Sequence, residues 1–280
     1  MRNFTFKGLL LTAVFMLLGC LSIQAANDDL ITKQITINLD KAGTLPNKIA
    51  SSEMYKITNL KIIGEINGTD WNMIREMAGR DNRGYGTEGK LSVLDLSEAK
   101  IVKGGDSYYP GDNCYTSNDE IGEKAFTDCS RLTSLTLPVG ITSIGYDAFA
   151  YCSGLTSLTL PAGITSIGEF AFSYCSGLTS IYVYAEKVPR IGRYAFEGCA
   201  SRKCTLYVPK GTYDNYRLSE FGYFENIVEF DATGIDKTTT STDVEEVSRY
   251  SLNGQRLAVP VKGLNIVKYS DGTVRKVVVK

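Results

Sequence analysis

The sequence predicts a mainly β solenoid, a fold in which short repeats stack along one axis and each repeat contacts its neighbours. The first observation is a pair of consecutive, nearly identical segments of 23 residues, Leu132–Gly154 and Leu155–Gly177. A third copy, Leu178–Ala200, keeps the same skeleton with a changed surface. Self-similarity at a fixed period of this size is the signature of a repeat architecture.

The second observation is the placement of leucine within each copy. Leucines stand at the first, fourth and sixth positions, as in Leu132, Leu135 and Leu137. This spacing fits the leucine-rich-repeat pattern, in which one short strand per turn points its apolar side chains inward and stacks on the next strand. We therefore expect a leucine-rich repeat solenoid with turns of about 23 residues, N- and C-terminal caps and a small C-terminal β unit.

The composition of the chain narrows the classes of function that it can have. The chain has 280 residues, with 30 Lys and Arg against 31 Asp and Glu, so no basic surface suggests nucleic acid. It has no histidine, the commonest general base and metal ligand. No carboxylate pair stands at a recognisable spacing, and no nucleophile has a base partner. We expect no enzymatic activity, no cofactor and no metal.

The N-terminus has the pattern of an export signal over residues 1–25. Arg2 and Lys7 precede the apolar run Gly8–Leu21, and Ala25 ends a cleavage site. The run is short for a membrane-spanning helix, so the mature chain is expected to lack an integral span. Lipid anchoring through Cys20 is the alternative to simple secretion. Either route places the mature chain in the extracellular space or at the cell surface, including the outer membrane.

The segment before the repeats should cap the N-terminal end of the solenoid. We expect a strand within Ile31–Leu39, a degenerate repeat strand over Ile57–Ile66, and a helix over Asp70–Ala78 that its first residue caps. Trp71 is the only tryptophan of the chain and is expected to cover the open end. Terminal repeats need such a cover because their apolar interior would otherwise face water.

The first clear repeat strand, Leu91–Ser97, is followed by an insertion. In the strand, Leu94 and Leu96 should point inward and Asp95 outward. The insertion, Ile101–Asn118, is rich in Gly, Tyr and Asp, and loops that interrupt a solenoid can carry its function. Its candidate ligand-binding residues are Tyr108, Tyr109, Asp112 and Tyr115; a loop without a function is the other interpretation.

Each regular turn carries the motif Ile-Gly-x-x-Ala-Phe, first at Ile121–Phe126 and last at Ile191–Phe196. The Ala and Phe should face inward. The Gly is expected at a sharp turn with positive φ, and the Ala-Phe piece should form one helical or 3₁₀ turn opposite the strand.

Four cysteines recur once per turn and should form a ladder inside the solenoid. A metal site or disulfide bonds are possible for such a column, but without His or a CxxC motif we interpret it as buried, unreactive thiols. The four are Cys129, Cys152, Cys175 and Cys199, while Cys114 and Cys204 lie outside the ladder.

The C-terminal part should close the solenoid and then form a separate β unit. Cys204–Val208 is the expected last repeat strand, and Tyr213–Phe230 should cover it with a helix, a strand and the aromatics Phe221, Tyr223 and Phe224. Two hairpins are expected beyond, at Asn253-Gly254 and Ser270–Gly272. The expected domains are residues 1–25 (signal), 26–90 (N-terminal cap), 91–211 (repeats), 212–236 (C-terminal cap), 237–246 (linker) and 247–280 (β module).

Outward positions of the repeat strands are the candidate binding surface. Adjacent strands lie about 4.8 Å apart, so these residues should form one row on the sheet. The row is expected to contain Asp95, Thr136, Thr159, Tyr182 and Tyr207, with Tyr184 nearby. The tyrosines could form an aromatic binding patch or could pack under the C-terminal cap. A second row, after each Ile-Gly, is expected to contain Lys124, Asp147, Phe170 and Tyr194.

The repeated Ile-Gly-x-x-Ala-Phe, Cys-Ser-Gly-Leu and Ser-Leu-Thr-Leu-Pro segments resemble the BspA-like leucine-rich repeat of secreted and surface proteins of Bacteroidetes. The resemblance covers Leu91–Gly211. Leu60–Met77 is similar to the segment that precedes such repeats, and Tyr250–Lys280 is similar to short C-terminal β modules of exported proteins, some of which act as sorting signals. The resemblance implies extracytoplasmic location and adhesion to a protein or matrix, without catalysis, and it supplies no binding residues.

Two functions follow. The first is an adhesin-like protein that recognises a host or bacterial protein, such as a host matrix or surface protein, through the strand face. The alternative is a glycan-binding surface component of a nutrient uptake system, which would require stacked aromatics.

Overall fold

The computed structural model describes residues 30–109, 114–232, 246–251, 256–257, 261, 263–269 and 274–279. The expected signal, Cys20, Asp112, the linker up to residue 245 and the turns at Asn253-Gly254 and Ser270–Gly272 lie outside these residues. Within the described residues no helix is long and apolar enough to cross a membrane.

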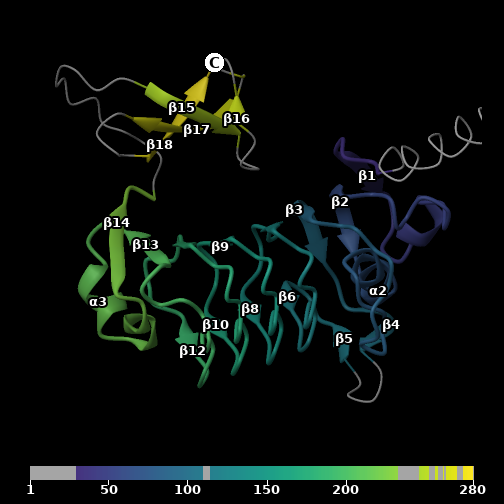
Figure 1. Ribbon diagram of the computed structural model, residues 1–280, viewed down its shortest axis with the longest axis horizontal. Helices are drawn as coiled ribbons and strands as arrows, with labels where there is room; N and C mark the ends of the chain where they lie inside the picture. The colour runs from purple at the N-terminus through teal and green to yellow at the C-terminus, as the bar shows by residue number, and fades with distance from the viewer. Residues whose placement is uncertain are drawn as a thin grey trace, which may run out of the picture.

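One wall of the solenoid is an eight-stranded parallel sheet with the order β1-β2-β3-β7-β9-β11-β13-β14 (Figure 1). The mainly β solenoid fold is thereby confirmed, and the sheet extends past the expected last strand, since β14 pairs in parallel with β13. The bounds are β1 Ile35–Leu39, β2 Asn59–Ile66, β3 Val93–Ile101, β7 Ser134–Thr136, β9 Ser157–Leu160, β11 Ser180–Val183, β13 Thr205–Pro209 and β14 Asn226–Phe230.

A second sheet lies on the other side of the solenoid (Figure 1). Its four strands have two residues each and pair in parallel in the order β12-β10-β8-β6. Each regular turn therefore has two strands rather than the one that the sequence predicted. Two residues are too short to show the alternation by which a strand is recognised. The bounds are β6 Glu120–Ile121, β8 Ser143–Ile144, β10 Ser166–Ile167 and β12 Arg190–Ile191.

The Ala and Phe of the repeated motif face inward, as predicted, and the Phe rings form a column through the core. Phe149 stacks on Phe126 at 5.3 Å and on Phe172 at 5.0 Å between ring centroids. Trp71 stands at the N-terminal end of the column, 5.1 Å from Phe126, so it covers the first turn as expected. The segment that holds each Phe forms single turns closed by i to i+3 hydrogen bonds, for example from Ser173 N to Phe170 O at 2.9 Å, which agrees with the predicted single 3₁₀ turn.

The prediction of positive φ at the motif glycines is wrong. Positive φ occurs two residues later instead, at Lys124, Asp147, Phe170 and Tyr194. The glycines are required by close approach between turns, because a Cβ on Gly168 would lie 2.6 Å from the carbonyl carbon of Gly145 in the preceding turn. No real Cβ tolerates that distance, so any side chain here would push the turns apart.

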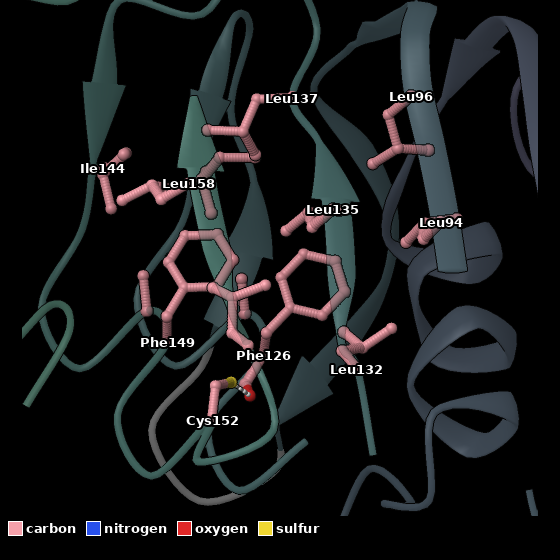
Figure 2. Packing of buried hydrophobic residues seen from close by; sticks show 14 of the residues in the cluster. Leu94, Leu96, Phe126, Leu132, Leu135, Leu137, Ile144, Phe149, Cys152 and Leu158 are labelled. Atoms are coloured by element: carbon pink, nitrogen blue, oxygen red, sulfur yellow. Dashed lines mark hydrogen bonds between the residues drawn. The ribbon is translucent and has the colours of Figure 1, made fainter. Parts of the chain in front are cut away.

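The four repeated cysteines form the predicted internal ladder. Each of the last three donates its thiol to a carbonyl of the preceding turn: Cys152 Sγ lies 3.0 Å from Phe126 O (Figure 2), and Cys175 Sγ lies 3.1 Å from Phe149 O. Burial raises the pKa of Cys129 to about 11. These thiols therefore stay protonated and serve packing, since the thiolate is the reactive and metal-binding form.

The N-terminal cap is built around helix α2, Gly68–Met77. Its N-cap is Asn67 rather than the predicted Asp70; the two residues form a capping box. Asp70 is fully buried and also accepts hydrogen bonds from the backbone N–H groups of Gly43 (2.6 Å) and Leu45 (2.8 Å), at the start of the 3₁₀ helix η1, Leu45–Asn47. One carboxylate thus joins α2 to the preceding loop.

The insertion after β3 is a short antiparallel hairpin rather than an irregular loop. Strands β4, Gly104–Tyr109, and β5, Cys114–Thr116, pair with each other, and β4 packs on α2. The insertion therefore belongs to the N-terminal cap.

The C-terminal cap follows the prediction. It contains the helix α3, Tyr213–Arg217, the 3₁₀ helix η2, Glu220–Tyr223, and β14. Phe221 and Phe224 are buried against Phe196, the last ring of the Phe column. Tyr223 is more exposed, but its hydroxyl donates to Cys199 O at 2.8 Å.

The C-terminal β module is an antiparallel sheet with the order β16-β15-β17-β18. Its pairing agrees with the two predicted hairpins, since β15 pairs with β16 and β17 pairs with β18. The bounds are β15 Glu246–Ser251, β16 Arg256–Leu257, β17 Gly263–Tyr269 and β18 Val274–Val279.

Candidate functional site

The predicted row on the outer face of the long sheet is present. The register pairs Asp95 with Thr136, Thr159 with Tyr182, and Tyr182 with Tyr207. It also continues beyond the predicted ends, to Lys61 before Asp95 and to Val228 after Tyr207. The row thus changes from charged through hydroxyl-bearing to aromatic along the axis of the solenoid.

Asp95 is not available to a ligand at its end of the row. Its side chain is buried and forms an ion pair with Lys61 at 3.5 Å, while Lys61 also bonds Glu98 at 2.6 Å. Asp95 further accepts the backbone N–H of Ser97 at 2.9 Å. The contacts of Lys61 hold β2 against β3. Asp95 therefore has a structural role in the sheet, although the sequence places it among the candidate binding residues. Thr136 and Thr159 are partly exposed.

At the other end of the row, four rings form what we call the aromatic cluster: Tyr182, Tyr184, Tyr207 and Phe230. Tyr182 and Tyr207 stack at 4.4 Å between centroids with nearly parallel planes. Phe230, from β14, stands edge-on to Tyr182 at 6.0 Å and to Tyr184 at 5.1 Å. All four rings are half-buried: the cap strand β14 packs on the tyrosines, which agrees with the predicted packing under the cap, and leaves part of each ring exposed. The binding role of these tyrosines stays a prediction.

A cation from the C-terminal module also contacts the cluster. The ammonium group of Lys276, on β18, lies 4.1 Å from the centroid of the Tyr184 ring. This distance is within the range of a cation–π interaction. The module therefore lies beside the C-terminal end of the strand face, as Figure 1 also shows.

The hydroxyl of Tyr182 remains neutral at physiological pH. Burial, together with the neighbouring Tyr207 and Tyr184, raises the pKa of Tyr182 to about 12. A neutral phenol can both donate and accept a hydrogen bond. Tyr182 therefore offers apolar ring area with an uncharged polar tip, the combination that makes tyrosine common in protein interfaces.

The tyrosines of the insertion do not form a common site. Tyr108 is 1% exposed, packs on Trp71 and donates its hydroxyl to Glu123 O at 3.0 Å, so its assignment as a ligand-binding residue is wrong. Tyr109 is partly buried, with the guanidinium of Arg75 5.4 Å from its ring centroid. Tyr115 is 52% exposed. Burial of Tyr108 follows from packing of the hairpin on α2, which periodicity could not reveal.

Sequence reasoning missed two exposed tyrosines on the opposite side of the solenoid. Tyr151 and Tyr174 stack at 5.0 Å with parallel planes and precede the ladder cysteines Cys152 and Cys175. Both have positive φ, as does Gly198 at the same place in the next turn. The sequence does contain one signal for these tyrosines. The equivalent positions of the other two turns hold Asp128 and Gly198, and because Asp and Gly are common at positive φ, the tyrosines between them could have been recognised as unusual.

A hollow of about 760 Å³ lies in the N-terminal cap, between the segment Pro46–Met54 and α2. Its lining includes Met73, Glu76 and Asp106. Burial, and secondarily Asp81, raises the pKa of Glu76. The hollow is separate from the strand-face row and contains none of the predicted site residues.

Comparison with known proteins places the repeats in a family. Residues 113–215 match the model of the BspA type leucine-rich repeat region, in six copies. No curated protein matches the chain. A leucine-rich repeat protein from Bacteroides ovatus is similar at 22% identity with a TM-score of 0.34, over 71% of this chain and 42% of that chain. The chain thus covers less than half of that protein. The expected resemblance is confirmed over the matched residues: residues 113–215 of this chain match the BspA type leucine-rich repeat region.

Proposed function

We propose that the chain is an extracytoplasmic, surface-associated binding protein that recognises a host or bacterial protein through the aromatic cluster. The observation that carries this proposal is the change along the strand-face row, from hydroxyls at Thr136 and Thr159 to the stacked pair Tyr182 and Tyr207. Tyrosines near the centre of an interface can carry most of its binding energy. The export pattern and the family supply the expected location.

The stacked rings that the glycan alternative requires are present, but their geometry favours a protein partner. A sugar ring binds by lying flat on an exposed aromatic face. Here the faces of Tyr182 and Tyr207 cover each other at 4.4 Å, and Lys276 lies over Tyr184. Edges and hydroxyls point outward from such a stack, and they suit the mixed apolar and polar surface of a protein.

The test is a double substitution, Tyr182→Ala with Tyr207→Ala, in the mature full chain. Binding to an array of host matrix proteins and glycans should reveal the partner and then weaken about tenfold or more in the double variant, as for central interface tyrosines. Thr136→Ala with Thr159→Ala, in the same row, is the matched control and should change binding little.

A second pair of variants separates packing from recognition. Tyr182→Phe with Tyr207→Phe keeps the stack and removes the hydroxyls, so it should lose only the hydrogen-bonding part of the affinity. Circular dichroism shows whether each variant is folded. Unchanged binding by a folded Ala variant would place the site elsewhere, and tyrosine fluorescence that responds to a sugar alone would favour the glycan alternative.

A further inference from the structure

We propose that the side of the solenoid opposite the long sheet is a second binding surface, for a basic segment of a partner protein. The surface, which we call the turn strip, consists of the segments that follow each Ile-Gly: residues 123–128, 146–151, 169–174 and 193–198. This proposal is independent of the aromatic cluster and uses none of its residues.

The turn strip exposes two sets of aromatic side chains. Tyr151 and Tyr174 are 51% and 46% exposed and stack on each other. Tyr194 is 60% exposed and stacks on Phe170 at 5.3 Å, and Phe170 meets the exposed Tyr146 edge-on at 5.9 Å. The first set is thus a stacked pair on two neighbouring turns, and the second is a row of three rings on three successive turns. Contiguous exposed apolar area of this kind marks interaction sites more often than scattered single residues do.

The backbone gives these aromatics no structural reason to be present. Tyr151, Phe170, Tyr174 and Tyr194 have φ between 55° and 61°, a region that bulky L-residues rarely adopt. Gly198 fills the same column as Tyr174 and fits it without strain. Stacking offsets part of this strain, and about half of the Tyr151 and Tyr174 side chains stays exposed, which leaves them open to an external contact.

The charge of the turn strip identifies the chemistry of the partner. The strip carries two cations, Lys124 and Arg193, against five carboxylates, on Glu123, Asp128, Asp147, Glu169 and Glu197. Arg80 donates to Asp128 O at 3.1 Å and adds a cation at the first turn, so the excess of carboxylates lies on the later turns, while the whole chain has a formal net charge of −1. Electrostatic complementarity therefore favours a partner rich in arginine or lysine.

Tyrosine hydroxyls and carboxylates act together in this recognition. In the stack of Tyr151 on Tyr174 the ring faces cover each other at 5.0 Å, so edges and hydroxyls point outward. A phenol oxygen and a carboxylate both accept hydrogen bonds from guanidinium or ammonium groups. The ring edges offer apolar surface to the methylene stem of Arg or Lys. An extended basic segment can repeat this contact from turn to turn.

The experiment measures binding of two labelled peptides to the full mature chain by fluorescence anisotropy. One peptide alternates arginine and serine, and the other alternates glutamate and serine. The arginine peptide should bind more tightly. Tyr151→Gly with Tyr174→Gly keeps the charge and fits the backbone, and it should weaken binding of the arginine peptide about tenfold, as for two lost contacts to charged groups.

Two further variants separate the possible outcomes. Glu169→Gln with Glu197→Gln should weaken binding and reduce its dependence on salt, because screened charge attraction is then smaller. Tyr182→Ala with Tyr207→Ala, on the strand face, should leave the affinity for the arginine peptide unchanged. Unchanged affinity in the folded glycine variant would overturn the proposal, since charge alone would then explain binding. Loss of affinity only in the strand-face variant would overturn it as well and would assign the basic ligand to the aromatic cluster.

Discussion

The solenoid has two long walls that are built from the same repeat but are held together in different ways. The strand wall is the long parallel sheet, and the turn wall consists of the Ile-Gly segments, the turn strip and the cysteine ladder. In the strand wall, the turns are joined by the ladder of the parallel sheet, and aliphatic side chains such as Leu158 and Ile181 fill the interior. In the turn wall, backbone N–H groups also reach the following turn, for example from Phe149 to Ala171 O at 2.7 Å. That wall additionally depends on stacked rings, on glycines without room for a Cβ, and on residues with positive φ.

The difference shows where the repeat can vary. The strand wall constrains inward side chains and leaves outward positions such as Thr159 and Tyr182 free to change, because pleated strands tolerate most residues on their solvent face. The turn wall constrains the backbone itself, at Gly168 through close approach and at Tyr174 through φ. A change of an outward residue is therefore easily tolerated on the strand wall, whereas on the turn wall it must also fit a constrained backbone.

The largest effects should come from emptying the interior of either wall. Leu158→Ala should cost about 2–5 kcal/mol of unfolding free energy and Phe149→Ala about 3–5 kcal/mol, because both side chains are fully buried. Urea denaturation followed by circular dichroism measures both. Thr159→Ala, next to Leu158 on the outward face, should change stability by less than about 0.5 kcal/mol. A Leu158 variant as stable as the Thr159 variant would mean that the strand wall is not the packed core described above.

The close approach between neighbouring turns of the turn wall can be tested by a substitution that adds a single methyl group. Gly168→Ala would place Cβ 2.6 Å from the carbonyl carbon of Gly145, so it should cost about 1–3 kcal/mol or more through overpacking. Gly163→Ala is the matched control in the same repeat, since its Cβ would find Ile141 O at 3.5 Å, an ordinary contact. Equal stability of the two variants would show that the turns can separate without cost.

The cysteine ladder of the turn wall makes stability depend on alkaline pH. Burial raises the pKa of Cys129 to about 11 and that of Cys199 to about 12, from an ordinary 9.0. Because the folded-state pKa values are raised, their contribution is complete below about pH 9 and is lost as pH rises through 11 to 12. The urea midpoint should fall over this window, and Cys129→Ala should make the fall shallower. A midpoint that falls equally steeply in that variant would exclude the Cys129 thiol as a cause.

The sequence revealed the strand wall more fully than the turn wall. Period and leucine spacing predicted the row from Thr136 to Tyr207, because side chains alternate strictly along strands and equivalent residues align between turns. The same reasoning placed the Phe column and the cysteines inside. It did not place Lys61 beside Asp95, because β2 is a degenerate repeat strand whose pairing with β3 shifts register just after Lys61.

On the turn wall, the backbone preferences of single residues gave the wrong prediction because contacts with the neighbouring turn decide the structure. Gly after Ile suggested positive φ, but the glycine is required by the neighbouring turn and the positive φ falls on residues such as Asp147. The same holds for the candidate site: the sequence predicts Tyr108 in a ligand loop, but its own hairpin packs on α2 and buries it against Trp71. Contacts between distant segments decided both cases, and no single-sequence pattern records them.

The smallest expected effect tests whether an exposed aromatic of the turn wall is structural. Tyr151→Gly relieves a positive φ of 61°, worth about 1 kcal/mol, but loses the stack on Tyr174, worth about 0.5–1.5 kcal/mol. The two terms nearly cancel, so unfolding free energy should change by less than about 1 kcal/mol in either direction. Tyr151→Ala, which loses the stack and keeps the strain, should be the less stable of the two. If Tyr151→Gly instead cost as much as Phe149→Ala, the ring would be part of the core, and its exposure could no longer be explained by a binding role.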